Sequence, residues 1–295
     1  MVVFPMSSIS LQHGDCLELM KNIPDKSIDM ILCDLPYGTT ACKWDSVIPL
    51  NEHIIIKNKI YSFNDYLQQE LKKNINYIEI CEQWNEKKKY GLWHYYKKII
   101  KEDGVVVLFG QEPFSSMLRN SNIGWYRYDW IWQKEKPSNF QLMNYQPGRV
   151  QENIMIFSPK KACYTSNGNS IRYIPQMEDR EKIRIANAKI YGDTTKNILH
   201  TYPNGEKNNI KIYDKKYPIS IIKFNNDIHK LHPTQKPLTL CEYMIKTYSN
   251  KGDLVLDNCM GSGTTGLACK NLNRSFIGIE KEEKYFEIAK ERIGV

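Results

Sequence analysis

Long hydrophobic runs and paired cysteines are missing from this sequence of 295 residues. No run approaches the roughly 20 apolar residues that a membrane span requires, so no partner membrane is expected. The start of the chain is too short and uncharged to be a signal peptide. The eight cysteines include no C-x-x-C pair, which argues against a zinc site or a disulfide framework. These absences predict a protein of a reducing cytoplasm, with no metal.

Acidic residues are outnumbered by basic ones, and the excess of basic charge is concentrated in one region. The net charge is +8 and the hydrophobic content is 41%, enough for a large α/β domain with a smaller inserted one. Residues 160–230 contain 14 Lys or Arg against 7 Asp or Glu, a local charge of +7. A basic segment interleaved with Tyr, Asn and Phe indicates a polyanionic partner. The alternative is an ordinary solvated surface.

A glycine-rich turn near the C-terminus predicts a cofactor site. An apolar strand at 254–257 ends in Asp257, a helix follows from Thr264, and a second strand at 276–279 ends in Glu280. Glycines allow the backbone to turn sharply and to approach a ligand, and an acid after the second strand suits a ribose diol. The unit is expected to bind an adenosine-containing cofactor, or else to be a tight turn without a ligand. The glycines in question are Gly261, Gly263 and Gly266.

A second polar cluster, Asp34-Leu35-Pro36-Tyr37, follows the apolar run at 28–33. A carboxylate and a backbone carbonyl at the end of a buried strand can accept the two N–H groups of an exocyclic amine. An aromatic ring beside them can stack on the base that carries this amine. Taken alone, the quartet could equally be a polar turn.

The order of the two clusters decides between cofactors. After Glu280 only one more helix fits, at about 283–293, whereas a nicotinamide-binding domain needs several further βα units. The rest of the sheet must therefore come from upstream sequence, including strands at 9–12, 28–33 and 105–109. A helix is predicted at 92–101, and antiparallel strands at 125–132 and 154–157 are expected to close the sheet.

The chain resembles the β-class amino-methyltransferases of DNA, in particular phage-type and prophage-type members. The quartet resembles their D-P-P-Y motif, residues 254–263 resemble their S-adenosylmethionine motif, and His232–Pro237 resembles the H-P-x-Q-K-P segment before it. Leu35 replaces the usual proline, at a position expected to act through its carbonyl. The resemblance implies an α/β, Rossmann-like fold that is circularly permuted, with a mostly parallel sheet and one antiparallel strand.

The same resemblance divides the chain into three parts. Residues 1–159 form the catalytic half of the methyltransferase domain, 160–230 a target-recognition region, and 231–295 the cofactor-binding half. About 40 residues, 51–90, are an insertion that includes a helix-like stretch at 66–73. The insertion is expected to grip DNA or a second subunit in a homodimer, or to be a neutral surface excursion.

The resemblance also assigns site residues. Asp34, Leu35, Pro36 and Tyr37 are expected to be catalytic. The cofactor S-adenosylmethionine is expected at Asp15, Lys236, Asp257, Gly261, Gly263, Thr264 and Glu280, although Asp15 could simply cap a helix. A polar loop at 134–149 could clamp an extruded base of double-stranded DNA or be an ordinary loop; its candidates are Lys134, Lys136, Asn139, Phe140 and Arg149.

The predicted activity is methylation of adenine N6 in a flipped-out base, as in restriction–modification systems of bacteria and phages. In the family, Asp at the first position of the quartet accompanies adenine. The alternatives are a cytosine-N4 enzyme of the same fold, a methyltransferase of RNA or of protein amides, and a catalytically silent DNA-binding relative.

Overall fold

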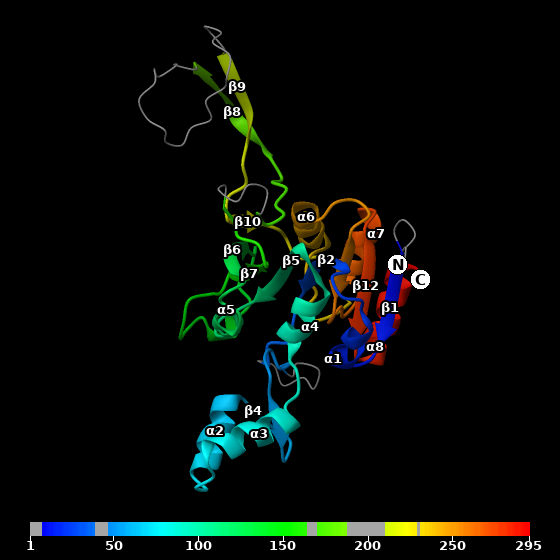
Figure 1. Cartoon of the computed structure of the whole chain (residues 1–295). Coiled ribbons are helices and arrows are strands. Elements are labelled where there is room, and N and C mark those ends of the chain that lie inside the picture. Colours follow the sequence, from blue (N-terminus) through cyan, green and yellow to red (C-terminus); the bar gives the residue numbers. More distant parts are fainter. Residues whose placement is uncertain (1–7, 39–46, 164–169, 188–209, 229–230) are drawn as a thin grey trace, which may run out of the picture. The chain divides into compact units, whose positions relative to one another are not determined.

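A computed structural model describes residues 8–38, 47–163, 170–187, 210–228 and 231–295 (Figure 1). The structure divides into two units. The first combines residues 1–174 with 220–295, and the second comprises 175–219. Both predicted halves of the active site fall in the first unit.

The first unit is built on one eight-stranded sheet. Its strands are β1 (Ile9–His13), β2 (Ile28–Cys33), β5 (Ile100–Gly110), β6 (Tyr126–Gln133), β7 (Gln151–Phe157), β10 (Ile221–Lys223), β11 (Leu254–Asp257) and β12 (Ser275–Glu280). Their order is β1-β12-β11-β2-β5-β7-β6-β10. Every neighbouring pair is parallel except the two that β7 forms, because β7 runs antiparallel to β5 and to β6. The predicted mostly parallel sheet with one antiparallel strand is confirmed.

Helices cover both faces of this sheet. One face packs against α1 (Cys16–Leu19), α4 (Leu92–Ile99) and α5 (Phe114–Ser121), and the other against α6 (Leu238–Tyr248), α7 (Thr264–Asn271) and α8 (Glu283–Ile293). All six residues of β2 are buried, since both of its faces are covered. This double burial explains why the strand is a nearly continuous apolar run in the sequence.

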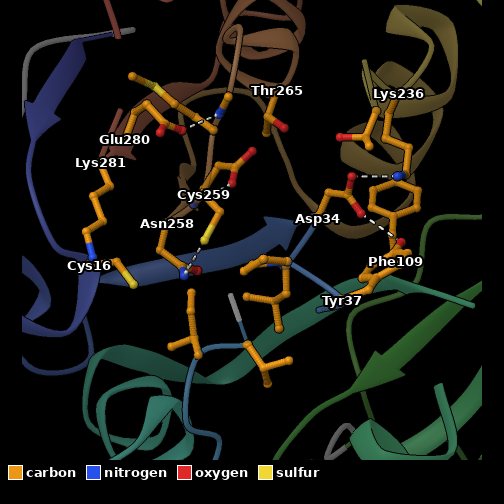
Figure 2. Close-up of a pocket in the computed structure, with 18 of the residues that line it drawn as sticks. Cys16, Asp34, Tyr37, Phe109, Lys236, Asn258, Cys259, Thr265, Glu280 and Lys281 are labelled. Atoms are coloured by element: carbon orange, nitrogen blue, oxygen red, sulfur yellow. Dashed lines mark hydrogen bonds and ion pairs between the residues drawn. The ribbon is translucent and has the colours of Figure 1, made fainter. Parts of the chain in front are cut away.

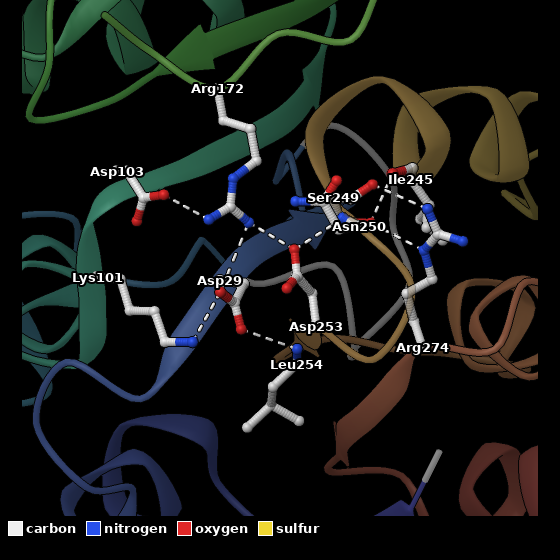
Figure 3. Close-up of polar contacts among 10 residues, drawn as sticks. All are labelled: Asp29, Lys101, Asp103, Arg172, Ile245, Ser249, Asn250, Asp253, Leu254 and Arg274. Carbon is white, nitrogen blue, oxygen red and sulfur yellow. Dashed lines mark hydrogen bonds and ion pairs between the residues drawn. The ribbon is translucent and has the colours of Figure 1, made fainter. Parts of the chain in front are cut away.

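Asp29 is the one charged residue of β2, and it is buried like the others. Its contacts hold neighbouring strands together at the amino-terminal edge of the sheet. It accepts hydrogen bonds from Lys101 Nζ at 2.7 Å and from the Leu254 N–H at 3.0 Å, which tie β2 to β5 and β11. Arg172 joins the same cluster through 2.5 Å contacts with Asp103 and Asp253 (Figure 3). A buried carboxylate with several such partners does not incur the cost of an unpaired charge.

The predicted helix at 92–101 ends earlier, at Ile99. Ile100 already has extended backbone and pairs with Ile28 of β2, so strand β5 begins before Gly104. Helix α5 was not predicted from the sequence. Two short 3₁₀ helices complete the unit, at Met20–Asn22 and Phe140–Leu142.

The insertion at 51–90 has a small core of its own. It contains the hairpin β3 (Ile54–Ile56) and β4 (Lys59–Tyr61) and the helices α2 (Phe63–Leu71) and α3 (Tyr77–Lys87). Its buried residues are Ile54, Tyr66, Ile80 and Trp84. The predicted helical stretch at 66–73 overlaps α2, which begins earlier, after a capping box at Ser62, and ends at Leu71.

The second unit contains an antiparallel pair of strands, β8 (Glu178–Asn187) and β9 (Ile210–Lys216). It lies inside the region 160–230 that the sequence marks as basic. Residues 164–169, 188–209 and 229–230 of that region are outside the described residues. Among the described residues, no helix is both long and apolar enough to cross a bilayer.

Candidate active site

The two predicted motifs meet at one edge of the sheet. Because β11 pairs directly with β2, Asp257 at the end of β11 and Asp34 just after β2 lie at the ends of neighbouring parallel strands. A cavity of about 1650 Å³ opens at this edge and is lined by residues of both motifs (Figure 2). The circularly permuted order of the two motifs, which the sequence predicts, therefore brings them together in one site.

Asp34 and Tyr37 form the centre of the predicted catalytic cluster. The Tyr37 hydroxyl lies 2.8 Å from Asp34 Oδ1 and 3.0 Å from Glu152 Oε1, so its single proton is shared between two carboxylates. The Tyr37 ring stacks on Phe114, with centroids 5.0 Å apart. Leu35 and Pro36 also line the cavity, Leu35 with its side chain buried.

Lys236 lies against this catalytic cluster. Its Nζ is 2.5 Å from Asp34 Oδ2 and 2.9 Å from Glu152 Oε1. It also lies over the rings of Tyr37 and Phe109, at 5.7 and 5.2 Å from their centroids. The sequence placed Lys236 with the cofactor residues, whereas the structure directs its ammonium to Asp34.

Glu152 is a site residue that sequence reasoning missed. Its second oxygen pairs with Lys134 Nζ at 2.6 Å, and its side chain is only 5% exposed. Glu152 is near the start of β7, and an antiparallel strand brings its amino end to the edge where the parallel strands finish. The sequence predicts the antiparallel direction of this strand, and that prediction could have identified Glu152 as a site residue.

Charge compensation holds this cluster together. Burial by itself would raise the pKa of Glu152, but Lys236 and Lys134 outweigh it and lower the pKa to about 2. For Lys236, burial acts to lower the pKa, while Asp34 and Glu152 reverse the effect and raise it. Lys236 is therefore a permanent ammonium in this site and not a proton acceptor.

On the cofactor side, Glu280 shapes the glycine turn. Its carboxylate accepts the N–H of Gly261 at 2.9 Å and that of Glu282 at 2.8 Å, while the side chain still lines the cavity. Gly261 has a φ of 52°, and a Cβ there would have no neighbour closer than the His232 ring at 3.8 Å. An acid with remaining lone pairs beside an open backbone turn fits the predicted adenosine-containing cofactor.

The glycines after this turn have a packing role. Gly263 has a φ of 78°, and a Cβ on it would lie 2.9 Å from the Cβ of Ala289 in α8. A Cβ on Gly266 would lie 2.5 Å from Ile293 of the same helix. The Thr264 hydroxyl is 2.8 Å from Arg292 Nη1, which donates to it. These residues bring α7, α8 and β12 into close contact.

The segment 232–237 is attached to the glycine turn. Gln235 Oε1 accepts hydrogen bonds from Ser262 Oγ at 3.2 Å and from the Leu231 N–H at 3.0 Å. Gln235 Nε2 donates to Asp227 at 2.8 Å. By fixing Gln235 to the turn, these bonds hold the adjacent Lys236 at the catalytic cluster.

Asp15 has the helix-capping role that the sequence left open as an alternative. Its side chain accepts the Leu17 N–H at 2.9 Å, and Lys281 Nζ lies 3.4 Å from its other oxygen. Asp15 also lines the cavity. Its contact with the cofactor adenine stays a prediction.

The candidate DNA-binding loop is partly closed by its own hydrogen bonds. Asn139 accepts the Arg149 N–H at 2.5 Å and donates to the Pro147 carbonyl at 3.2 Å. Lys136, Asn139 and Arg149 line the cavity, whereas Phe140 is 69% exposed and is not among its lining residues. Lys134, bound to Glu152, belongs to the catalytic cluster. Its contact with DNA stays a prediction, as do those of the other loop residues.

Asp257 predicts a measurable pH dependence of stability. Burial raises its pKa to about 7, although hydrogen bonds from Thr265 and from the Cys259 N–H act to lower it. A folded-state pKa above the unfolded value means that the folded state binds the extra proton, so stability falls as pH rises from about 4 to about 7. Without cofactor, Asp257→Asn should be more stable than the unmodified protein by on the order of 2–4 kcal/mol at pH 8, and nearly equal at pH 4.

Urea unfolding at both pH values measures this difference. The matched surface control is Asp25→Asn, which removes one carboxylate from a side chain that is 66% exposed. A gain for Asp257→Asn of the same size at pH 4 and pH 8 would contradict the assignment.

Among the described residues, no group of three or more His, Cys, Asp or Glu side chains is placed to hold a metal ion.

Comparison with known proteins gives a consistent result. A family model described as DNA methylase matches residues 28–291. The type II methyltransferase M.HpaI of Haemophilus parainfluenzae is 28% identical over 284 residues, covering 95% of this chain and 72% of that protein. The type II methyltransferase M.HinfI of Haemophilus influenzae is 29% identical over 293 residues, covering 96% and 68%.

Two solved structures share the fold. The M1.HpyAVI–SAM complex superimposes with a TM-score of 0.52 at 23% identity, over 97% of this chain and all of that one. The PvuII DNA methyltransferase, described as cytosine-N4-specific, superimposes with a TM-score of 0.58 at 16% identity, over 97% of this chain and 86% of that one.

Proposed function

Because this chain belongs to the N6/N4 DNA methylase family, we propose that it methylates adenine N6 in a base flipped out of double-stranded DNA. S-adenosylmethionine is the cofactor of this DNA methyltransferase. The observation that most supports the proposal is the carboxylate of Asp34, which faces the cavity from a strand adjacent to the glycine motif. The adenine assignment depends on Asp34 as the first residue of the quartet, which accompanies adenine in the family.

Three of the cofactor residues proposed from the sequence have a geometry that suits S-adenosylmethionine. Glu280 has lone pairs for the ribose hydroxyls, Gly261 leaves its backbone open to a ligand, and Asp15 lines the same cavity. When bound, the cofactor supplies an electrophilic methyl group.

The protein's own residues would position the nucleophile. The lone pair of an aromatic amine is delocalised into its ring, so the amine is a weak nucleophile. Asp34 and the Leu35 carbonyl would each accept one N–H, which directs the lone pair out of the base plane. Tyr37 would stack on the extruded base. Positioning of this kind supplies much of the rate enhancement in displacement reactions, and the excess proton can leave after transfer.

Cytosine N4 is the second candidate. The solved PvuII enzyme, which shares the fold, is described as cytosine-N4-specific. Adenine and cytosine carry chemically similar exocyclic amines, so Asp34 and the Leu35 carbonyl could hold either one.

We also propose that residues 160–230 recognise the DNA target and that the insertion 51–90 contributes to DNA binding or to a homodimer. The basic excess of 160–230 suits phosphate contacts, which would offset the cost of extruding a base. In the insertion, Ile55 and Ile60 face each other across the β3–β4 hairpin, remain exposed, and line the cavity.

The proposed activity predicts a specific product. Purified protein incubated with unmethylated double-stranded DNA and methyl-labelled S-adenosylmethionine should place the label in N6-methyladenine after digestion to nucleosides. Label in N4-methylcytosine would overturn the adenine assignment. Label only in RNA or protein substrates, or no label at all, would overturn DNA methylation by this chain.

A further inference from the structure

Lys236 is positioned to read the target base, a role that none of the sequence motifs assigns to it. Building on the proposed function, we propose that Asp34 and Lys236 act as an acceptor–donor pair. Asp34 accepts an N–H of the target amine, and Lys236 donates to the ring nitrogen beside that amine. Lys236 would thus select bases in which the amine adjoins an unprotonated ring nitrogen on the Watson–Crick edge.

The geometry of the pair fits the edge of one base. Asp34 Oδ2 and Lys236 Nζ are 2.5 Å apart, and both residues line the cavity. Their side chains are 22% and 9% exposed, so both are largely shielded from water but reach the space that an extruded base would enter. Two polar groups at such a separation can bond to adjacent atoms of a planar ring, as in bidentate recognition of a base.

Lys236 has a hydrogen-bond donor left for this purpose. An ammonium carries three N–H groups, and two of them are directed to Asp34 and Glu152. The third has no acceptor among the contacts found within the described part of the chain. Tyr37 and Phe109 place their ring faces near the ammonium, so the third donor lies beside the proposed stacking surface.

The chemistry of the bases explains the selectivity. Adenine presents N6 beside N1, and cytosine presents N4 beside N3; in each, an amine donor adjoins an acceptor. Thymine presents the reverse order, a carbonyl beside a protonated ring nitrogen. On the Watson–Crick edge of guanine, the ring nitrogen beside the amine is N1, which is protonated. A wrong base would leave the third N–H of Lys236 without an acceptor in a largely buried site, which costs more than the loss of one hydrogen bond.

Glu152 would keep Lys236 in its donating position. Its Oε1 lies 2.9 Å from the ammonium and supplies the second negative charge that keeps the lysine protonated. Glu152 therefore acts through Lys236 and is a positioning residue, while Lys236 would touch the substrate itself.

A deaza substitution tests the contact directly. Duplexes would carry adenine, 1-deazaadenine or 7-deazaadenine at the methylated position, with 7-deazaadenine as the control that retains N1. For the unmodified protein, kcat/KM should fall about 10- to 100-fold with 1-deazaadenine, as expected for a lost bond to a charged donor, and little with 7-deazaadenine. If cytosine is the methylated base, 3-deazacytosine replaces 1-deazaadenine.

A substitution of Lys236, combined with the deaza substitution of the base, completes a double-mutant cycle. Lys236→Met should be slower on adenine, but it should lose less than about 3-fold more with 1-deazaadenine, because the contact is already absent. Calorimetry should show its affinity for S-adenosylmethionine unchanged. Lys236→Arg keeps the positive charge and should still react more slowly with 1-deazaadenine than with adenine. It is the variant to measure if Lys236→Met does not fold.

Two outcomes would overturn the proposal. One is equal rates of the unmodified protein on adenine and 1-deazaadenine. The other is an equal loss with 1-deazaadenine in Lys236→Met and in the unmodified protein, since the loss would then arise from the base itself. Failure of the unmodified protein to methylate any DNA is a distinct result that contradicts the proposed function.

Discussion

Asp34→Ala should lower the methyl-transfer rate by about 10³-fold or more while changing the affinity for S-adenosylmethionine by less than about 3-fold. Removing one preorganised electrostatic contact at a reacting group typically costs 10²–10³ in rate, and Asp34 would also orient the amine. The glycine turn should stay intact, because its own bonds run between Glu280 and Gly261.

Asp34→Asn is the matched variant. It keeps the shape of the side chain and one accepting oxygen but removes the charge that pairs with Lys236. Its transfer rate should lie between those of the unmodified protein and Asp34→Ala. Single-turnover methylation measures the rate, and calorimetry measures cofactor binding. A large loss of cofactor affinity in either variant would show that Asp34 belongs to the cofactor site.

Motif order made the centre of the site predictable from the sequence. The strand before Asp34 and the strand before the glycine turn are both short and apolar, and each is followed directly by one of the two motifs. The sequence therefore predicts that the two strands share one sheet, and β11 does pair with β2. Parallel neighbours then place their following residues at the same edge.

The role of Lys236 depends on its contact with Asp34, a residue far away in the sequence. The position of Lys236 in the segment before the glycine motif suggests a cofactor ligand, yet its ammonium bonds to a carboxylate 202 positions away. The bonds of Gln235 to the glycine turn determine where Lys236 lies, and no periodicity or motif spacing reveals that pairing.

The polar loop illustrates a second limit. Asn139 is a candidate DNA contact because its residue type and basic surroundings suit nucleic acids, and this contact stays a prediction. In the structure its amide bonds to the Arg149 N–H and the Pro147 carbonyl of the same loop. Side-chain bonds to nearby backbone are common for Asn and compete with ligand contacts. Composition identifies a polar loop, whereas the bonds formed within it depend on the folded backbone.

Glu152 gives the second large expected effect, on stability. Glu152→Ala should lower the free energy of unfolding by about 3–5 kcal/mol, because it leaves the buried ammonium of Lys236 and that of Lys134 without their shared carboxylate. Glu152→Gln is the matched control for volume and hydrogen bonding. It should cost less, because the amide oxygen can still accept from one lysine.

The effect should depend on pH in a defined direction. The folded-state pKa of Glu152, about 2, lies below its ordinary value of 4.5. The charged form therefore contributes stability that is complete above about pH 4.5 and is lost as pH falls toward 2. The stability gap between the unmodified protein and Glu152→Gln should reach on the order of 3 kcal/mol at pH 6 and shrink by pH 3. Urea unfolding at the two pH values measures it, and a gap that stays constant, or that widens in acid, would show that Glu152 is not held as a carboxylate by the two lysines.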